Sequence, residues 1–309
     1  MLVLALPGAA RLAADLAHHL RCEWSELAQH RFPDGESLVR IDAPVEGRCV
    51  VLAGSLDQPD AKTLPLLFAA DAARELGAAQ VGLAAPYLAY MQQDRRFNPG
   101  EAITSRTYAR LLSSSLDFLV TVDPHLHRWR ALEELYPIRT RVVESAPAIA
   151  RWVRSNVDAP MLVGPASESA QWVEHVARLC DAPWTVMDKT RRGDREVSVQ
   201  LAAAISWEGH TPVLLDDIVS TGNTMVAAVE TLVAANARPP VCIAVHALLD
   251  GDVLRRLMRA GIAHFVSCDT IPHPTNAIAI APDLAKAVHS LAGAATPHHR
   301  SHANVFSQL

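Results

Sequence analysis

The fold is decided by the stretch Pro212-Val213-Leu214-Leu215-Asp216-Asp217-Ile218-Val219-Ser220-Thr221-Gly222-Asn223-Thr224. Its apolar beginning, followed by two acids, is typical of a buried strand of a parallel sheet that reaches solvent. A turn of small residues comes next, and the segment that starts at Met225 has the composition of a helix. Together these elements predict an anion site, because the first amides of a helix have no intrahelical partner and carry partial positive charge.

The side chains of this stretch indicate which kind of anion it binds. Gly222 lets a ligand approach the backbone, and the hydroxyls of Thr221 and Thr224 add hydrogen-bond donors. Asp216 and Asp217 would repel a phosphate, but they suit ribose hydroxyls or a Mg²⁺ ion. The simpler interpretation is an N-cap turn beside two solvated acids. The acid pair directly before the turn favours a sugar-phosphate site instead.

Length and composition indicate a globular protein of two ordinary domains. The chain has 309 residues, of which 50% are hydrophobic and 20% are charged. A net charge of −5 without a basic block gives no support to nucleic-acid binding. Five scattered cysteines without metal-type spacing favour a reduced environment. Without a signal-peptide pattern or a run that could span a membrane, we expect a cytoplasmic protein that does not contact membranes.

Alternating strand and helix patterns predict an α/β fold with mainly parallel sheets flanked by helices. The pattern restarts around residues 137–147, which we interpret as a domain boundary. We therefore expect an N-terminal domain over residues 1–142 and a C-terminal domain over residues 143–291. Residues 292–309 carry several histidines without periodicity, so they predict a disordered tail.

Polar groups follow several of the predicted strands. In an extended chain Asp123, His125 and His127 would lie on one side, two residues apart. An acid and an imidazole at the carboxyl end of a strand favour a cation or phosphate site for Asp123 and His125, and leave the role of His127 open. Arg95 and Arg96 follow another strand, where they are either ligand-binding groups or a solvated pair.

Two further segments have alternative interpretations. Residues 31–36 contain an aromatic residue and two carboxylates, and by themselves they favour a plain Pro-x-Gly turn. Residues 188–195 are dense in charge and have no apolar anchor, so they predict a mobile, exposed loop. Such a loop is either simply solvated or a cationic lid that closes over phosphates.

Taken together, five segments resemble the ribose-phosphate diphosphokinases (5-phosphoribosyl-1-diphosphate synthetases), and the branch typical of archaea more than the common bacterial one. The central stretch alone resembles the ribose-phosphate loop of phosphoribosyltransferase-fold proteins. The segments occur in the family's order over roughly residues 1–290. They are Phe32-Pro33-Asp34-Gly35-Glu36, Gln93-Asp94-Arg95, Thr121-Val122-Asp123-Pro124-His125, Lys189-Thr190-Arg191 and residues 216–224.

The resemblance implies a fold, a reaction and a cofactor. The fold is two phosphoribosyltransferase-like domains in a homo-oligomer whose active sites lie between domains and across subunits. The reaction transfers the β,γ-diphosphoryl group of ATP to the anomeric hydroxyl of ribose 5-phosphate, giving 5-phosphoribosyl 1-diphosphate and AMP, with Mg²⁺ as the cofactor. Such a transfer needs charge neutralisation and in-line positioning from the protein.

The resemblance also implies a role for each matched residue. Lys189 and Arg191 would be catalytic lid cations on the transferring group, and Asp123 and His125 would bind metal. ATP would be bound by Phe32, Asp34, Glu36, Gln92, Gln93, Asp94 and His125, the first three holding the adenine of a neighbouring subunit. Ribose 5-phosphate would be bound by Asp216, Asp217, Ser220, Thr221, Gly222, Asn223 and Thr224.

Departures from the family pattern leave two alternatives open. Gln92 stands where an ATP-contacting arginine is usual, and Ala166 stands where the family has an aspartate that can ligate a second metal. Ser220 in place of an acid and Asn223 in place of a glycine are milder changes. The first alternative, a non-catalytic regulatory paralogue, is supported by the two larger losses and opposed by the lid cations. The second, a phosphoribosyltransferase that joins a base to the sugar, is disfavoured by the two-domain length and the adenine motif.

Overall fold

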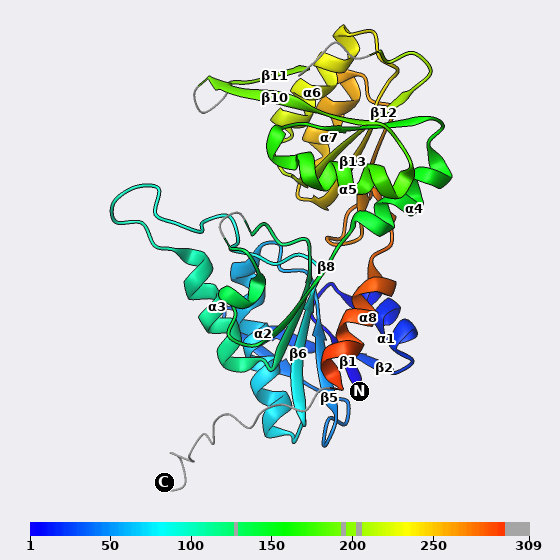
Figure 1. Ribbon diagram of the computed structural model, residues 1–309. Coiled ribbons are helices and arrows are strands. Elements are labelled where there is room, and N and C mark those ends of the chain that lie inside the picture. Colours follow the sequence, from blue (N-terminus) through cyan, green and yellow to red (C-terminus); the bar gives the residue numbers. More distant parts are fainter. Residues whose placement is uncertain (127–128, 193–195, 202–205, 294–309) are drawn as a thin grey trace, which may run out of the picture.

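The computed structural model describes residues 1–126, 129–192, 196–201 and 206–293, and for residues 189–192, 196–199 and 201 it gives only the course of the backbone. Within these residues the chain forms two α/β units, each built around a sheet (Figure 1). The tail expected over residues 292–309 lies outside the described residues from residue 294 on. No helix in the described part of the chain is long and apolar enough to cross a membrane.

The N-terminal unit contains a six-stranded parallel sheet. Its central strands are buried along nearly their whole length, as expected where helices cover both faces of a parallel sheet. The strand order is β2-β1-β5-β6-β7-β8. The strands are β1 (Leu2–Ala5), β2 (Glu23–Glu26), β5 (Cys49–Ala53), β6 (Gln80–Ala85), β7 (Phe118–Val122) and β8 (Arg139–Val143).

Two helices cover each face of this sheet. On one face α2 (Pro59–Glu75) and α3 (Thr104–Ser115) bury side chains such as Leu66 and Leu112, and the short 3-10 helix η1 (Leu132–Glu134) lies near them. On the other face α1 (Ala10–Leu20) packs beside α8 (Ala281–Ala292), the last described helix.

The placement of α8 differs from the expected domain boundary. Residues 143–291 were expected to form the C-terminal domain, but α8 packs on the N-terminal sheet beside α1 (Figure 1). Leu284 and Val288 of this helix are fully buried there. The reason is that α1 alone leaves part of this apolar face open, and the amphipathic α8 completes its cover.

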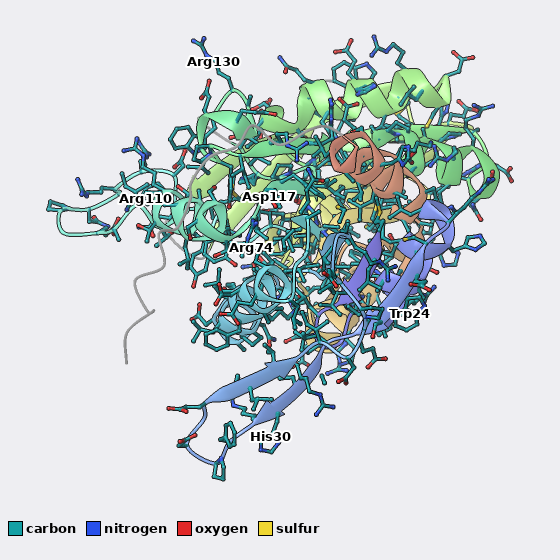
Figure 2. The ribbon with its side chains drawn as sticks, turned by 90° about the horizontal axis from the view of Figure 1, so that it is seen from below. Trp24, His30, Arg74, Arg110, Asp117 and Arg130 are labelled. Carbon is teal, nitrogen blue, oxygen red and sulfur yellow. The ribbon has the colours of Figure 1, made fainter. Side chains whose placement is uncertain are left out.

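A small antiparallel hairpin stands apart from the N-terminal sheet. It consists of β3 (Ala28–Arg31) and β4 (Ser37–Arg40), and its side chains are mostly exposed. The hairpin projects away from the body of the molecule, with His30 near its outer end (Figure 2). Its tip is the turn formed by residues 32–36.

The C-terminal unit contains a seven-stranded sheet in the order β11-β10-β9-β12-β13-β14-β15, and among its described strands only β10 and β11 pair antiparallel. Its helices again lie on both faces, with α4 and α5 on one and α6 and α7 on the other. The strands are β9 (Pro160–Gly164), β10 (Trp184–Arg192), β11 (Glu196–Leu201), β12 (Thr211–Val219), β13 (Val241–Ala247), β14 (His264–Cys268) and β15 (Asn276–Ile278). The helices are α4 (Ala146–Asn156), the 3-10 helix η2 (Ser167–Ser169), α5 (Ala170–Cys180), α6 (Asn223–Ala234) and α7 (Gly251–Ala260).

We expected a mobile loop over residues 188–195, and this expectation is wrong for residues 188–192. Strand β10 continues through Arg192 and pairs with β11, Lys189 lying opposite Val199 and Arg191 opposite Val197. An antiparallel ladder is held by backbone hydrogen bonds, so it does not require apolar side chains on the charged strand. Residues 193–195 lie outside the described part of the chain.

The two units share one continuous apolar core. A single cluster of buried side chains includes Val120 of the N-terminal sheet, Leu284 of α8, Ile149 of α4 and Leu162 of the C-terminal sheet. The chain passes between the units twice, once from β8 to α4 and once from β15 to α8. The carboxyl ends of β7 and β12 meet at this junction, where the candidate site lies.

Candidate active site

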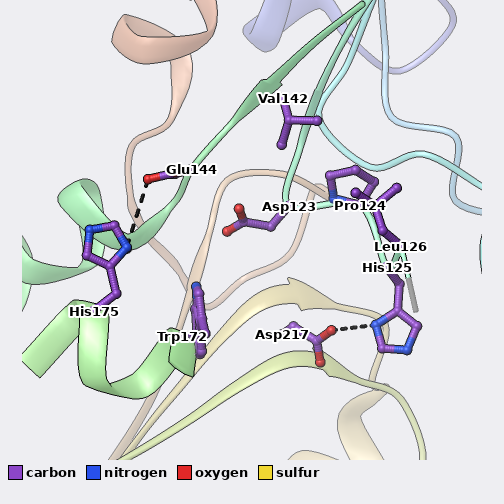
Figure 3. A pocket seen from close by; sticks show the side chains of 10 residues that line it. Asp123, Pro124, His125, Leu126, Val142, Glu144, Trp172, His175 and Asp217 are labelled. Carbon is purple, nitrogen blue, oxygen red and sulfur yellow. Dashed lines mark hydrogen bonds and ion pairs between the residues drawn. The ribbon is translucent and has the colours of Figure 1, made fainter. Parts of the chain in front are cut away.

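The candidate site is built around a contact between the two units. His125 follows β7, Asp217 belongs to β12, and Nδ1 of His125 lies 2.7 Å from Oδ2 of Asp217 (Figure 3). The hydrogen bond to Asp217 raises the pKa of His125 above its ordinary value. Burial alone would raise the pKa of Asp217, but the hydrogen bond from His125 and its charge bring it below its ordinary value. The arrangement therefore favours an imidazolium paired with a carboxylate.

Asp123 lies close by, but its side chain points away from that of His125 (Figure 3). The chain is not extended at Asp123, because β7 ends at Val122 and Asp123 has a left-handed backbone with φ 33, so the condition for Asp123 and His125 to lie on one side of a strand is not met. His127 lies outside the described residues. Oδ2 of Asp123 accepts hydrogen bonds from the backbone N–H of Ser145, at 3.0 Å, and from its hydroxyl. Burial nevertheless raises the pKa of Asp123 to about 6.

These side chains line a cavity of about 350 Å³ at the junction of the two units. Sequence reasoning missed three other residues that line it, namely Glu144, Trp172 and His175 (Figure 3). Glu144 follows β8 as Asp123 follows β7, so its position after a strand was a usable signal, whereas the two residues on α5 offered none. Nδ1 of His175 lies 3.9 Å from Oε2 of Glu144 across the junction.

The predicted sugar-phosphate loop connects β12 to α6. The strand continues to Val219, so Asp216 and Asp217 lie within it rather than after it. Oδ1 of Asp216 accepts the N–H of Asp217 at 3.1 Å, and Oδ1 of Asp217 accepts the N–H of Ile218 at 2.8 Å. These hydrogen bonds hold both carboxylates at the end of the strand, beside the turn.

The turn itself requires glycine at its centre. Gly222 has φ 70, and a Cβ atom there would lie 2.4 Å from Cγ1 of Val253 on α7. A side chain would therefore meet both backbone strain and a steric clash. Because of this glycine, α6 can begin at Asn223 directly after the turn.

The start of α6 has the features of an anion site. No side chain caps this helix, and among the described residues nothing accepts a hydrogen bond from the backbone N–H groups of residues 221–224. The hydroxyl-bearing residues Ser220 and Thr221 are exposed, and Thr224 is half-buried. Unpartnered amides at the positive end of a helix bind phosphate readily.

The loop after β6 places a further carboxylate near the junction. Asp94 is buried, and its charge is one of the influences that raise the pKa of His125. Gln93 is half-buried, and its side-chain amide contacts Glu101, whereas Gln92 is exposed. Arg95 and Arg96 are both exposed and make contacts within this loop, which are compatible with either interpretation. Arg95 lies over the ring of Phe97, and Arg96 donates to the carbonyl of Glu101 at 2.8 Å.

Three predicted ATP-binding residues are not brought to the junction by their own chain. Phe32, Asp34 and Glu36 form the turn of the β3–β4 hairpin, where the N–H of Phe32 donates to the carbonyl of Glu36 at 2.8 Å. Oδ1 of Asp34 accepts the N–H of Glu36 at 3.0 Å. Phe32 is 40% exposed and packs edge-on against His30. An exposed aromatic on a projecting hairpin is suited to a ligand or a partner outside this chain.

The predicted catalytic cations lie on the β10–β11 hairpin. The backbone of Lys189 and Arg191 is described, but their side chains lie outside the description. Ala166, the other departure from the family pattern, follows β9, and its carbonyl accepts the hydroxyl of Ser169 at 2.7 Å. Its methyl group offers no metal ligand.

No group of three or more His, Cys, Asp or Glu side chains converges as a metal site within the described residues. Mg²⁺ usually keeps several waters and is held by one or two carboxylates together with substrate phosphates. Asp123, Asp216 and Asp217 provide oxygen atoms of that kind near the junction. The donor set therefore fits Mg²⁺ that arrives with a phosphorylated substrate.

Two α/β units with mainly parallel sheets, together with a strand–turn–helix anion loop, define a phosphoribosyltransferase-type protein. Comparison with known families agrees with this class. Residues 1–115 match the N-terminal domain of ribose phosphate pyrophosphokinase, and residues 132–286 match the phosphoribosyl transferase domain. The chain belongs to the ribose-phosphate pyrophosphokinase family, as the five sequence segments predicted.

Individual relatives agree with this assignment. The chain is 34% identical to the ribose-phosphate pyrophosphokinase of Methanopyrus kandleri, over 95% of this chain and 100% of that one. It is also 34% identical to that of Saccharolobus solfataricus, over 78% of this chain and 82% of the relative. The crystal structure of phosphoribosylpyrophosphate synthetase from Mycobacterium smegmatis superimposes with a TM-score of 0.81, covering 94% of this chain and 98% of that chain at 23% identity. This likeness confirms the predicted fold of two phosphoribosyltransferase-type domains.

Proposed function

We propose that this protein transfers the diphosphoryl group of ATP to the anomeric hydroxyl of ribose 5-phosphate. The hydroxyl oxygen forms a bond to the β-phosphorus, the bond from that phosphorus to the oxygen bridging to the α-phosphate breaks, and the hydroxyl proton is released. The products are 5-phosphoribosyl 1-diphosphate and AMP. The observation that carries the proposal is the anion loop at the end of β12, beside the His125–Asp217 contact, in a chain of this family.

The loop would bind ribose 5-phosphate through two kinds of group. The backbone N–H groups of residues 221–224 and the hydroxyls of Ser220, Thr221 and Thr224 would hold the phosphate. Asp216 and Asp217 would accept hydrogen bonds from the ribose hydroxyls. This division follows from charge, because carboxylates repel a phosphate and attract hydroxyl donors.

ATP would lie on the other side of the junction. Gln93, Asp94 and His125 belong to the N-terminal unit, and an imidazolium at His125 would attract the triphosphate. As a neutral imidazole His125 could instead bind the metal ion, the other role that the resemblance implies for it. The adenine would be held by the exposed hairpin turn of residues 32–36 of another subunit. That arrangement makes the active protein a homo-oligomer.

Mg²⁺ would be held by carboxylates at the junction together with the substrate phosphates. When bound, the ion neutralises phosphate charge on the diphosphoryl group. Asp123 is the candidate in the N-terminal unit, since Ser145 binds only its Oδ2. Lys189 and Arg191 of the β10–β11 hairpin would supply further positive charge to the transferring group.

The reaction is tested by incubating the protein with Mg-ATP and ribose 5-phosphate. We expect AMP and 5-phosphoribosyl 1-diphosphate to form in equal amounts, and no AMP to form when the sugar phosphate is left out. Formation of ADP, or failure to form AMP at every Mg²⁺ concentration, would contradict the proposal. Nuclear magnetic resonance of the phosphorus atoms separates these products directly.

A further inference from the structure

One arginine of helix α7, Arg256, donates two hydrogen bonds to the anion loop. Nη1 of Arg256 donates to the carbonyl of Thr221 at 3.2 Å, and Nη2 donates to Oδ1 of Asn223 at 2.8 Å. The two acceptors stand on either side of Gly222. The planar fork of a guanidinium can span two such acceptors, which a single ammonium cannot do with the same geometry.

The helix that presents Arg256 is firmly placed. Asp250 caps its start by accepting the N–H groups of Asp252 and Val253 at 2.9 and 3.0 Å. Leu257, the residue after Arg256, is fully buried beneath the helix. Val253 fills the space beside Gly222, so α7 contacts the loop at residues 221, 222 and 223. A contact made from such a helix can fix the loop in one conformation.

The contact at Thr221 sets the direction of a backbone donor. In a trans peptide the C=O of one residue and the N–H of the next point in opposite directions within one plane. Because the carbonyl of Thr221 points toward Arg256, the N–H of Gly222 points away from that guanidinium. The arginine therefore orients this amide toward the side of the loop on which a phosphate would lie.

Arg256 also brings a positive charge to a loop that has none of its own. It forms no ion pair with any described residue, whereas the adjacent Arg255 pairs with Asp252. The loop has no cationic side chain between residues 216 and 224, and Asp216 and Asp217 contribute negative charge. A cation behind the loop would offset that charge for an incoming phosphate.

We propose that Arg256 is a positioning residue for the sugar-phosphate loop. It acts through Thr221 and Asn223 to aim the loop amides at the 5-phosphate of the substrate, and its charge strengthens anion binding. The inference rests on the proposed function of the loop. Asn223, which stands where the family pattern has a glycine, supplies the second acceptor, so part of this contact is a feature of this chain.

The test compares Arg256→Ala with Arg255→Ala, a matched loss of one arginine on the same helix that leaves the loop contacts in place. Calorimetry measures the Kd of ribose 5-phosphate, and steady-state kinetics give both KM values. We expect Arg256→Ala to raise the Kd and KM for ribose 5-phosphate about ten-fold or more, as for loss of a charged hydrogen bond. The KM for ATP should stay within about two-fold. Arg255→Ala should change neither substrate constant.

A second pair of variants separates positioning from folding. Arg256→Lys keeps the charge but cannot hold both acceptors, so its KM for ribose 5-phosphate should lie between those of wild type and Arg256→Ala. In an Asn223→Gly background, Arg256→Ala should raise the KM for ribose 5-phosphate by a smaller factor than in wild type, because one of the two acceptors is already gone. If Arg256→Ala does not fold, Arg256→Lys takes its place. Its KM for ribose 5-phosphate is then measured both in the wild-type chain and in the Asn223→Gly background, and the comparison tests the positioning role.

Two results would overturn the inference. One is an Arg256→Ala variant whose ribose 5-phosphate Kd equals that of wild type, and the other is an equal rise in both KM values. If the alanine variant is unfolded, a wild-type Kd for Arg256→Lys would have the same meaning. Failure of the underlying function is distinguishable, because the wild-type protein would then bind no ribose 5-phosphate at all.

Discussion

Replacing Gly222 by alanine should destabilise the protein through two separable effects. The left-handed backbone at φ 70 costs a residue with a Cβ atom about 1 kcal/mol. The added Cβ would lie 2.4 Å from Cγ1 of Val253, and overpacking of this kind costs about 1–3 kcal/mol. We therefore expect Gly222→Ala to lower the free energy of unfolding by about 2–4 kcal/mol, the sum of these two costs. It should also raise the KM for ribose 5-phosphate, because the loop must shift.

The chain offers a control for each effect. Gly209, in the same unit, has φ 79, and a Cβ added there would meet no atom within 4 Å, so Gly209→Ala isolates the backbone cost. Val253→Ala removes the methyl group that would clash. In a cycle of the two single variants and the double variant, Gly222→Ala should therefore lower the free energy of unfolding by less when residue 253 is already alanine. Urea unfolding measures each of these proteins. The reasoning is refuted if Gly222→Ala costs no more than Gly209→Ala, or if the effects of the substitutions at 222 and 253 simply add.

Three other outcomes are expected. Burial lowers the pKa of His246 to about 4. Since an unfolded histidine has a pKa near 6.5, the unfolded chain gains this proton first as pH falls, and about 2 kcal/mol of stability should be lost between about pH 7 and pH 5. Urea unfolding of His246→Gln should show a weaker dependence on pH, and an equal dependence would contradict the assignment. Lys189→Ala should lower kcat by about two orders of magnitude or more with smaller changes in KM, so a near-normal kcat would exclude the catalytic role. Restoring the family pattern with Gln92→Arg and Ala166→Asp should lower the KM for ATP and the Mg²⁺ requirement in a Mg²⁺ titration, and no gain would mean that these losses are compensated elsewhere.

The parts of the site that depend on neighbouring residues could be predicted from the sequence. The strand, the turn around Gly222 and the start of α6 are local, because an apolar run, a small-residue turn and a helical pattern follow one another directly. The parallel sheets were predictable for the same reason. The resemblance of five short segments then placed the chain in its family before any geometry was known.

Contacts between distant segments could not be predicted in this way. His125 and Asp217 are far apart in the sequence, and nothing in either neighbourhood indicates that they meet. The position of the Asp123 side chain could not be predicted either. Its left-handed backbone accompanies contacts with Ser145, which follows β8 and is distant in the sequence. The β10–β11 hairpin was missed since its partner strand, not its own composition, holds it. Arg256 carries no local signal, as its acceptors belong to another element.

The position of α8 has a consequence for how the chain can be synthesised. A nascent chain that has emerged only as far as β8 has all six strands of the first sheet, yet one apolar face still lacks its second helix. That helix leaves the ribosome after the whole second unit. Until residues 281–292 have been synthesised, the first unit therefore remains incomplete, and positions such as Val120 and Val122, which are buried in the full chain, are more accessible to water. A fragment cut after residue 142 would lack α8 and keep this apolar face exposed, so we expect it to be less stable than the same unit in the full chain.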